Sequence, residues 1–494
     1  DDGRGVNQQP ARGIGREKGE AGGEEREQEQ RSGDDGGGRD PVRTGGDSGG
    51  FILPQTLNNQ RSREFGVAVD VARVLRTEGL FVCTFSNRCF PTKAIRGWLA
   101  TDDRDGAAAD VGTERHLGAV LGQCPAHPGA DRGVGAAVGR GAAVSDLSSI
   151  IKAYDVRGVV PDQWDETLAE LFGAAFVQVT GASVIVTGHD MRPSSPGLSR
   201  AFARGAAARG VDVTEIGLCS TDQLYYASGA LGLPGAMFTA SHNPAQYNGI
   251  KMCRAGAAPV GQDTGLAEIR ELVERWSEEG APEVTASTGT ITARDTLVDY
   301  AAHLRSLVDL TATRPLKVVV DAGNGMGGHT VPTVFAGLPL TVVPMYFELD
   351  GTFPNHEANP LDPANIVDLQ LRVREEGADL GIAFDGDADR CFVVDERGDP
   401  VSPSAITALV AARELARNGG KGVVIHNLIT SWSVPEVVKE HGGTPVRTRV
   451  GHSFIKAEMA KSGAIFGGEH SAHYYFKDFW NADTGMLAAL HVLA

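Results

Sequence analysis

A serine and three aspartates carry the most informative chemistry in the chain. An apolar, strand-like run ends abruptly in a polar loop that is led by Ser241. Far downstream, Asp385, Asp387 and Asp389 occupy alternate positions and are followed by Arg390. Alternate residues of extended or loop backbone project to one side, and hard carboxylate oxygens suit Mg²⁺. Together the two patterns predict a serine that carries a phosphoryl group beside a divalent cation, which would neutralise charge during transfer.

Each pattern has alternatives. The acidic loop also fits much of a calcium EF-hand, with Asp385 at position 1 and Glu396 at position 12. Arg390, however, stands at position 6, where that loop needs glycine, and the apolar flanks are typical of strands rather than helices. An acidic hairpin tip is a further alternative, but it leaves Arg390 unexplained. Ser241 could cap a turn before Asn-Pro, or act as a hydrolase nucleophile, although no G-x-S-x-G pattern surrounds it.

Composition restricts the class of protein. A length of 494 residues with 41% hydrophobic residues predicts several domains with apolar cores. The net charge of -17 argues against non-specific binding of nucleic acid and against attraction to anionic membranes. No apolar run reaches the roughly 18 residues of a membrane span, and no signal peptide is visible. The six cysteines form no C-x-x-C pair, so we expect neither a zinc site nor a disulfide framework but a reduced, cytoplasmic compartment.

The composition and the periodicity of the sequence change near residue 147. Residues 1–147 are rich in Gly, Ala and Arg or in charged residues, with poor periodicity, and predict a disordered or poorly structured extension. After it, three segments repeat one plan of strand, polar loop, helix and strand, at 184–217, 317–345 and 422–450. Each has the size of a βαβ unit, which indicates an α/β protein with parallel strands.

Two segments between these units predict linkers. Residues 280–295 are rich in Thr, Gly and Pro, and residues 395–404 contain glycine and two prolines. The uneven spacing of the three βαβ units favours three similar domains in series over a solenoid of short repeats.

Several motifs resemble those of the α-D-phosphohexomutases, and specifically of the bacterial phosphomannomutase/phosphoglucomutase group. The strongest are TASHNPAQYNGIK at 239–251 and FDGDADR at 384–390. Further matches follow in the family's order, namely KAYDVRG (152–158), GHDMRPSSP (188–196), GHSFIK (451–456) and GGEHSAHYYF (467–476). The resemblance covers about 148–494 and nothing before residue 147.

The resemblance implies serial mixed-sheet α/β/α domains. It places a phosphoserine loop in a first domain at 148–296, a metal-binding loop in a second at 297–396, and a sugar-recognition loop in a third at 397–494. The family's fourth, C-terminal domain, which grasps the remote phosphate, is expected to be missing, and the third domain to be cut short.

The same resemblance assigns roles to individual residues. The implied catalytic residues are Ser241, as the phosphoserine, with Lys251, Arg157 and His473. The implied metal ligands are Ser241, Asp385, Asp387 and Asp389. The implied substrate-binding residues are Tyr154, Arg390, His452, Lys456, Glu469 and Ser471.

The implied activity interconverts the 1-phosphate and 6-phosphate of mannose, glucose or both, through Ser241 and a 1,6-bisphosphate intermediate. The implied cofactor is Mg²⁺, with glucose 1,6-bisphosphate or mannose 1,6-bisphosphate as activator. We expect a phosphorylated hexose as substrate, neither a nucleic acid nor a membrane as partner, and a monomer or weak dimer.

Three other functions stay open. A phosphoglucosamine mutase would carry similar motifs, and a truncated fragment could bind sugar phosphate with little turnover. A dinucleotide-dependent oxidoreductase is suggested by Gly323, Gly325 and Gly328 after an apolar strand, with Glu348 and Asp350 about twenty residues on. The oxidoreductase hypothesis explains neither the serine loop nor the three aspartates.

Overall fold

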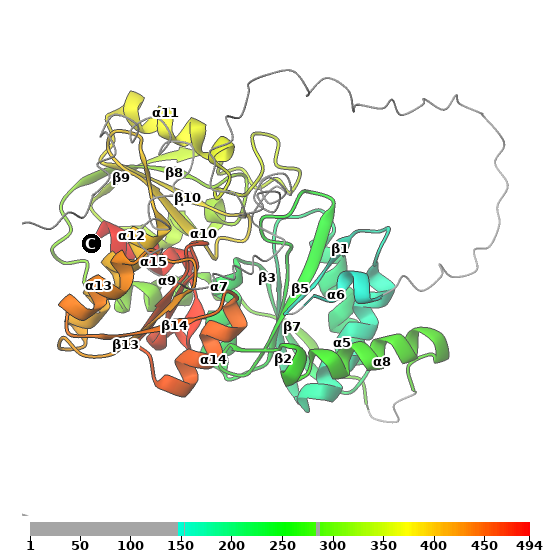
Figure 1. Ribbon diagram of the computed structural model, residues 1–494. Helices are drawn as coiled ribbons and strands as arrows, with labels where there is room; N and C mark the ends of the chain where they lie inside the picture. The colour runs from blue at the N-terminus through cyan, green and yellow to red at the C-terminus, as the bar shows by residue number, and fades with distance from the viewer. Residues whose placement is uncertain (1–146, 153, 283–286) are drawn as a thin grey trace, which may run out of the picture. The chain divides into compact units, whose positions relative to one another are not determined.

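The computed structural model describes residues 147–152, 154–282 and 287–494 (Figure 1). The predicted extension therefore lies outside the described residues except for Leu147. This residue does not belong to an extension, because it begins helix α4 (Leu147–Ile150) and is buried in the core of the first sheet. None of the described helices combines the length and the apolar character that a bilayer-spanning helix requires.

In the described residues the strands form three sheets, and all three are mixed. The first has the order β1-β5-β4-β2-β3-β7, with β6 paired to β5, the second β12-β11-β10-β8-β9, and the third β14-β13-β15-β16-β17. The strands of the first sheet are β1 (Val156–Val159), β2 (Val184–His189), β3 (Asp212–Leu218), β4 (Gly235–Phe238), β5 (Tyr247–Arg254), β6 (Ala258–Pro259) and β7 (Ile291–Ala293). Those of the second are β8 (Leu316–Asp321), β9 (Leu340–Met345), β10 (Leu380–Phe384), β11 (Cys391–Val394) and β12 (Pro400–Val401). Those of the third are β13 (Val423–Asn427), β14 (Thr444–Thr448), β15 (Phe466–Gly468), β16 (Tyr474–Phe476) and β17 (Ala482–Asp483).

The three predicted βαβ units are confirmed. The pairs β2–β3, β8–β9 and β13–β14 are parallel, and a helix connects each pair. Antiparallel pairs complete each sheet, including β4–β5 and β10–β11, whose connecting loops carry Ser241 and the three aspartates. The family resemblance predicts these mixed sheets. The alternation of strands and helices along the sequence predicts only the parallel pairs.

The helices begin and end at residues that satisfy free backbone groups. Asp165 caps α5, where its side chain accepts from the amides of Thr167 and Leu168, and Gly181 ends that helix in the left-handed region. The helices after α4 are α5 (Glu166–Thr180), α6 (Ser195–Ala207), α7 (Thr221–Leu231), α8 (Leu266–Glu279), α9 (Leu297–Ser306), α10 (Gly327–Val334), α11 (Val367–Glu376), α12 (Pro403–Arg417), α13 (Ser433–Glu440), α14 (His452–Ser462) and α15 (Gly485–Leu493). Short 3₁₀ turns lie at η2 (Gln262–Thr264), η3 (Pro363–Ile366) and η4 (Lys477–Phe479).

Both predicted linkers contain short strands. β7 pairs with β3 inside the first predicted linker, and β12 pairs with β11 inside the second. The sequence missed them because each has only two or three residues and lies at the edge of its sheet, where no apolar alternation is needed.

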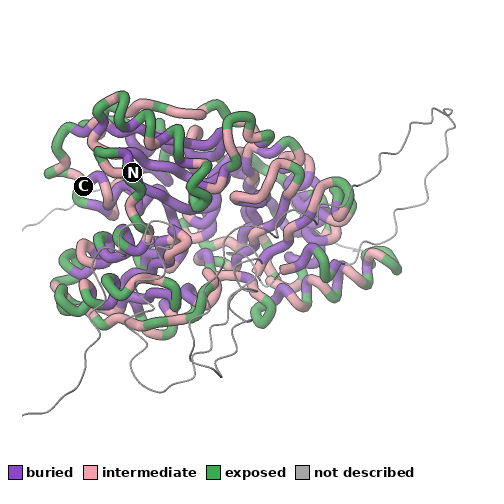
Figure 2. Tube along the Cα trace, turned by 45° about the horizontal axis from the view of Figure 1, so that its top comes forward, coloured by how far each residue is buried: buried purple, intermediate pink, exposed green. Residues whose placement is uncertain are grey.

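Buried residues concentrate along the strands and the inner faces of the helices (Figure 2). In the first sheet, Phe202 of α6 contacts both Phe176 and Phe238, with ring centroids 5.6 and 5.4 Å away. A second, larger apolar cluster joins the second and third sheets and includes Phe384, Phe466 and Leu490. Both cores hold the polar loops at the strand ends in fixed positions.

The glycine-rich loop after β8 is explained by close packing. A Cβ at Gly325 would lie 2.6 Å from the carbonyl oxygen of Gly386, and one at Gly328 would lie 2.3 Å from that of Phe347. These glycines therefore let the loop approach other backbone segments, which removes the need for a bound dinucleotide to account for them.

Candidate functional site

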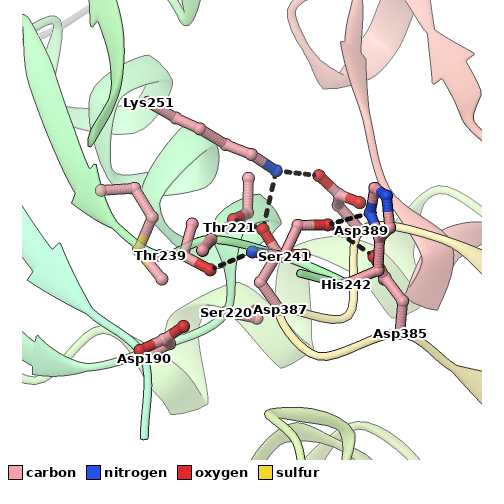
Figure 3. A network of polar contacts seen from close by, with 12 residues as sticks. Asp190, Ser220, Thr221, Thr239, Ser241, His242, Lys251, Asp385, Asp387 and Asp389 are labelled. Atoms are coloured by element: carbon pink, nitrogen blue, oxygen red, sulfur yellow. Dashed lines mark hydrogen bonds and ion pairs between the residues drawn. The ribbon is translucent and has the colours of Figure 1, made fainter. Parts of the chain in front are cut away.

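Ser241 lies in the tight loop between β4 and β5. It is buried, and its φ of 51° places a residue other than glycine in the left-handed region. Such a conformation costs of order 1–3 kcal/mol and persists only where surrounding contacts hold it. The amide of Ser241 donates to Thr239 Oγ1 at 2.9 Å, and the amide of Asn243 donates to the oxygen of Ala240 at 3.0 Å. The backbone of the loop is thus fixed by its own polar groups (Figure 3).

The acidic loop between β10 and β11 faces this serine. Ser241 Oγ donates to Asp385 Oδ2 at 2.8 Å. A Cβ at Gly386 would lie 2.5 Å from the carbonyl oxygen of Ser241, so the approach of the two loops requires glycine there. The structure therefore brings together the serine and the acidic run that the sequence singled out separately.

The three aspartates fit a divalent cation. One oxygen from each of Asp385, Asp387 and Asp389 lies within 4.8 Å of the other two, and all three residues are buried. Oδ1 of Asp387 and Oδ1 of Asp389 accept no hydrogen bond. A buried carboxylate oxygen without a donor is costly, and Mg²⁺ takes ligands of this kind. The flanking strands β10 and β11 exclude the helix–loop–helix of an EF-hand.

Basic side chains balance the acidic loop. Lys251 Nζ lies 2.7 Å from Asp387 Oδ2 and 2.5 Å from Asp389 Oδ2 (Figure 3). Burial alone would lower the pKa of Lys251, but the two carboxylates outweigh it and the pKa lies above its ordinary value. Arg390 Nη2 lies 2.7 Å from Asp385 Oδ2. Burial nevertheless raises the pKa of Asp385 to about 7, against the attraction of Arg390.

Arg157 lies beside the serine loop. Its Nη1 donates to Asn243 Oδ1 at 2.6 Å, and its Nε pairs with Asp155 at 2.7 Å. Tyr154 points toward the third sheet instead, where its ring packs edge-on against His452 and Phe454, with centroids 4.9 and 5.6 Å away. The segment before β1 therefore reaches two parts of the site.

Glu469 is held by three donors, from β13, from β16 and from the segment just before α14. Its Oε1 accepts from Asn427 Nδ2 at 3.0 Å and from the amide of Gly451 at 3.3 Å. Its Oε2 accepts from the hydroxyl of Tyr475 at 2.7 Å. The carboxylate is thus fixed in orientation before any ligand arrives.

His473, in the segment between β15 and β16, lies close to the acidic loop. Its Nδ1 is 3.6 Å from Glu469 Oε2, and its Nε2 is 3.6 Å from Asp389 Oδ1. Ser471 Oγ lies 3.2 Å from the same Nδ1. Backbone pairing between Arg390 and His473 joins this segment to the acidic loop directly.

Lys456 is buried, and His452 lies one helical turn before it in α14 and is partly buried. Lys456 Nζ lies 2.7 Å from Asp483 Oδ1 and 4.1 Å from the ring centroid of Tyr225, and the lysine is buried. Burial, reinforced by the nearby Lys456, lowers the pKa of His452 to about 3, so its imidazole is neutral near pH 7. The ammonium of Lys456, by contrast, is paired with the carboxylate of Asp483.

Sequence reasoning missed several residues of the site. Thr221 Oγ1 donates to Asp387 Oδ2 at 2.5 Å, and Arg192 donates to the carbonyl oxygen of Ser241 at 2.9 Å. Asp483 pairs with Lys456, and Asn427 with Glu469. Of these residues, only Arg192 lies in a motif that the sequence analysis identified, the GHDMRPSSP segment. Thr221, Asp483 and Asn427 contact partners that lie far away in the sequence.

Family profiles match most of the described chain. Phosphoglucomutase/phosphomannomutase alpha/beta/alpha domains I, II and III match residues 148–280, 298–398 and 402–494. A protein of Xanthomonas campestris pv. campestris described as "Phosphohexose mutases" is 43% identical over 337 residues, which are 68% of this chain and 74% of that protein. An Escherichia coli "Phosphomannomutase" is 41% identical over 348 residues, 69% of this chain and 76% of that protein.

A solved structure gives the same result for the fold. The crystal structure of a phosphoglucomutase/phosphomannomutase family protein from Burkholderia thailandensis superposes with a TM-score of 0.64 at 34% identity. The similarity covers 70% of this chain and 76% of that one.

Proposed function

The chain belongs to the phosphoglucomutase/phosphomannomutase family and is a phosphohexose mutase, and from that premise we propose that Ser241 carries the phosphoryl group between the two positions of the sugar. One observation supports this above all: Ser241 Oγ donates at 2.8 Å to an aspartate whose two acidic neighbours keep buried oxygens without a donor. That arrangement suits a phosphorylated serine beside a divalent cation.

The transfer is written with Ser241 as the donor. In its phosphorylated form, the phosphorus is attacked by a hydroxyl oxygen of a hexose monophosphate, the bond from phosphorus to Ser241 Oγ breaks, and the hydroxyl proton passes to a base. The product is a hexose 1,6-bisphosphate, which turns over within the site. The base then gives the proton to Ser241 Oγ. In the return step Ser241 Oγ attacks the other phosphoryl group, the bond from that phosphorus to the sugar oxygen breaks, and the proton of Ser241 passes to that oxygen. The isomeric monophosphate and the phosphorylated serine result.

The cationic residues have separate roles in this proposal. Arg157 stays protonated in proteins, so it binds oxygens of the transferring group and cannot act as the base. Lys251 is held in its charged form by Asp387 and Asp389 and neutralises charge on that group. Mg²⁺, when bound by the three aspartates with an oxygen of the phosphorylated serine, would neutralise more of the same charge.

His473 is the proposed proton carrier. Its ring lies between Asp389 of the acidic loop and Glu469 of the sugar-recognition loop, where a sugar hydroxyl and the reacting phosphorus must meet. Glu469 and Ser471 would hold sugar hydroxyls, while Tyr154 and His452 would line the same pocket. Lys456 supports this pocket through Asp483, and Arg390 fixes Asp385.

The proposed substrates are the phosphates of mannose, glucose or both, with a hexose 1,6-bisphosphate as activator. The names of the relatives support this choice over glucosamine phosphate. We also propose a cytoplasmic monomer or weak dimer. The described cysteines Cys219, Cys253 and Cys391 are unpaired and buried, which supports a reducing compartment.

The test is a turnover assay with a matched serine control. The protein is incubated with Mg²⁺, glucose 1,6-bisphosphate and the 1-phosphate of mannose, glucose or glucosamine. We expect the 6-phosphate of mannose or glucose, but not that of glucosamine. Ser241→Ala should remove turnover, whereas Ser277→Ala, on the distant helix α8, should keep it. Undiminished turnover by Ser241→Ala would refute the proposal.

A further inference from the structure

A fully buried arginine outside the proposed catalytic set holds the serine loop. Arg192 follows β2, and its side chain is 0% exposed. Its Nη1 donates to the carbonyl oxygens of Pro244 at 2.8 Å and Tyr247 at 2.9 Å. Its Nη2 donates to those of Ser241 at 2.9 Å and Asn243 at 2.7 Å. The four Nη hydrogens are therefore all used by one loop, and none remains for a substrate phosphate.

The guanidinium is suited to this task by its shape. It presents its donors in a rigid plane, whereas a lysine ammonium presents three donors from one point. Asp190 balances the charge, with its Oδ2 at 3.3 Å from Arg192 Nε. The other oxygen of Asp190 accepts from the amide of Arg192 at 2.9 Å and from Ser195 Oγ at 2.5 Å. The arginine is thus fixed from its own segment before it reaches the serine loop.

The contact to Ser241 bears on the strained backbone of that residue. Its φ of 51° is unfavourable for a side chain, so the neighbouring peptide groups must be held to maintain it. Arg192 holds the carbonyl that follows this torsion, at the point where Gly386 of the acidic loop also approaches. Loss of this contact would remove a partner that holds the backbone of Ser241 in the conformation in which its Oγ reaches Asp385.

Arg192 also contacts the segment that follows β9. Its guanidinium carbon lies 5.0 Å from the ring centroid of Phe353, and a Cβ at Gly351 would lie 2.5 Å from the Cα of Arg192. A change in this segment can therefore reach the serine loop through one side chain.

We propose that Arg192 is a positioning residue that holds Ser241 in the geometry for phosphoryl transfer, and that it governs kcat rather than KM. The inference rests on the proposed function, because it assumes that Ser241 is the residue that reacts. Since every Nη hydrogen of Arg192 serves the serine loop, its loss should leave the proposed sugar contacts of Glu469 and Ser471 in place.

The experiment compares two arginines. Arg192→Lys is assayed beside Arg209→Lys, whose guanidinium likewise lies over an aromatic ring (Trp276, 4.6 Å) and donates to a backbone carbonyl (Pro282, 3.1 Å). For each protein, kcat and KM are measured, together with the fraction of chain phosphorylated by glucose 1,6-bisphosphate, read by intact mass. A displacement near 1 Å at a reacting group can cost about 100-fold in rate, so we expect a loss of that order in the kcat of Arg192→Lys. We expect its KM to change by less than about threefold, because the uniform binding of the substrate is kept.

A second variant keeps the inference testable. If Arg192→Lys yields no folded protein, Phe353→Leu decides, because Phe353 is only partly buried and its ring packs on the Arg192 guanidinium. It should lower kcat and leave KM unchanged. Wild-type kcat in the folded variant, or a loss carried by KM, would overturn the inference. Wild-type protein that is not phosphorylated would instead sink the proposed function, and the inference with it.

Discussion

The hydroxyl of Thr221 donates a 2.5 Å hydrogen bond to Asp387 Oδ2, which joins the start of helix α7 to the acidic loop. The amide of Thr221 donates at 3.1 Å to the carbonyl oxygen of the same aspartate. The carboxylate and the carbonyl of Asp387 are therefore both oriented by the start of α7, while its Oδ1 has no donor. Asp387, a proposed cation ligand, is thus oriented by Thr221, which no motif of the sequence marked.

Thr221→Val should weaken Mg²⁺ binding. The change removes the hydroxyl that fixes Asp387, and loss of such a supporting contact commonly costs 10–100-fold in metal affinity. Isothermal titration of Mg²⁺ into the variant measures this directly. Thr214→Val, in β3, is the matched control, and equal affinities in the two variants would contradict the role given to Thr221.

Mg²⁺ should stabilise the folded chain, and the aspartates should be responsible. A ligand at about 100 times its Kd adds about 2.7 kcal/mol to the free energy of unfolding. We expect the melting temperature to rise with Mg²⁺ and to fall again when EDTA removes it. Asp389→Asn should lose this shift, whereas Asp478→Asn, at an exposed carboxylate in η4, should keep it. A shift that survives in Asp389→Asn would exclude this residue as a ligand.

Tyr475→Phe should weaken sugar binding. Its hydroxyl is one of three donors that orient Glu469, and a hydrogen bond to a charged group contributes about 1.5–3 kcal/mol. We expect KM to rise by about tenfold or more, in line with that energy. Tyr474→Phe is the matched control, since its hydroxyl donates to the carbonyl oxygen of Cys391 at 3.3 Å. An unchanged KM in Tyr475→Phe would show that Glu469 keeps its orientation without the tyrosine.

His452 should make the protein less stable in mild acid. Burial, reinforced by Lys456, lowers its pKa from 6.5 to about 3. Between these values the unfolded chain binds the proton and the folded chain does not, so the free energy of unfolding decreases as pH falls. For this group alone the decrease from pH 6.5 to 5.5 is about 1 kcal/mol.

Urea denaturation at the two pH values tests this. His452→Gln should lack the histidine's part of the decrease, whereas His441→Gln, at an exposed residue, should retain it. If wild type and His452→Gln lose the same stability over this range, the buried histidine is not the group that titrates.

Local pattern predicted much of the fold and the centre of the site. The β-branched runs of β2, β8 and β13 are long enough to be recognised, and the three βαβ units followed from them. Ser241 and Asp385 were identified because each lies in a short polar loop between apolar strands. The resemblance added the mixed sheets, which local pattern cannot supply.

The remaining site residues depend on contacts between distant segments. Thr221 and Asp387 lie 166 positions apart, and nothing around a threonine at a helix start marks it as the partner of a metal ligand. Asp483 pairs with Lys456 only because β17 joins the third sheet. Arg192 stood in a recognised motif, but its four carbonyl acceptors become visible only when the loop is folded around it.

The left-handed backbone of Ser241 has a consequence for how this position can vary. Glycine would adopt a φ of 51° without steric cost, so a glycine there should give a chain that folds more favourably and has no hydroxyl to phosphorylate. Stability and activity therefore favour different residues at the same position. Selection for a more robust fold alone would remove the reacting group, and its retention would be a mark of selection for turnover.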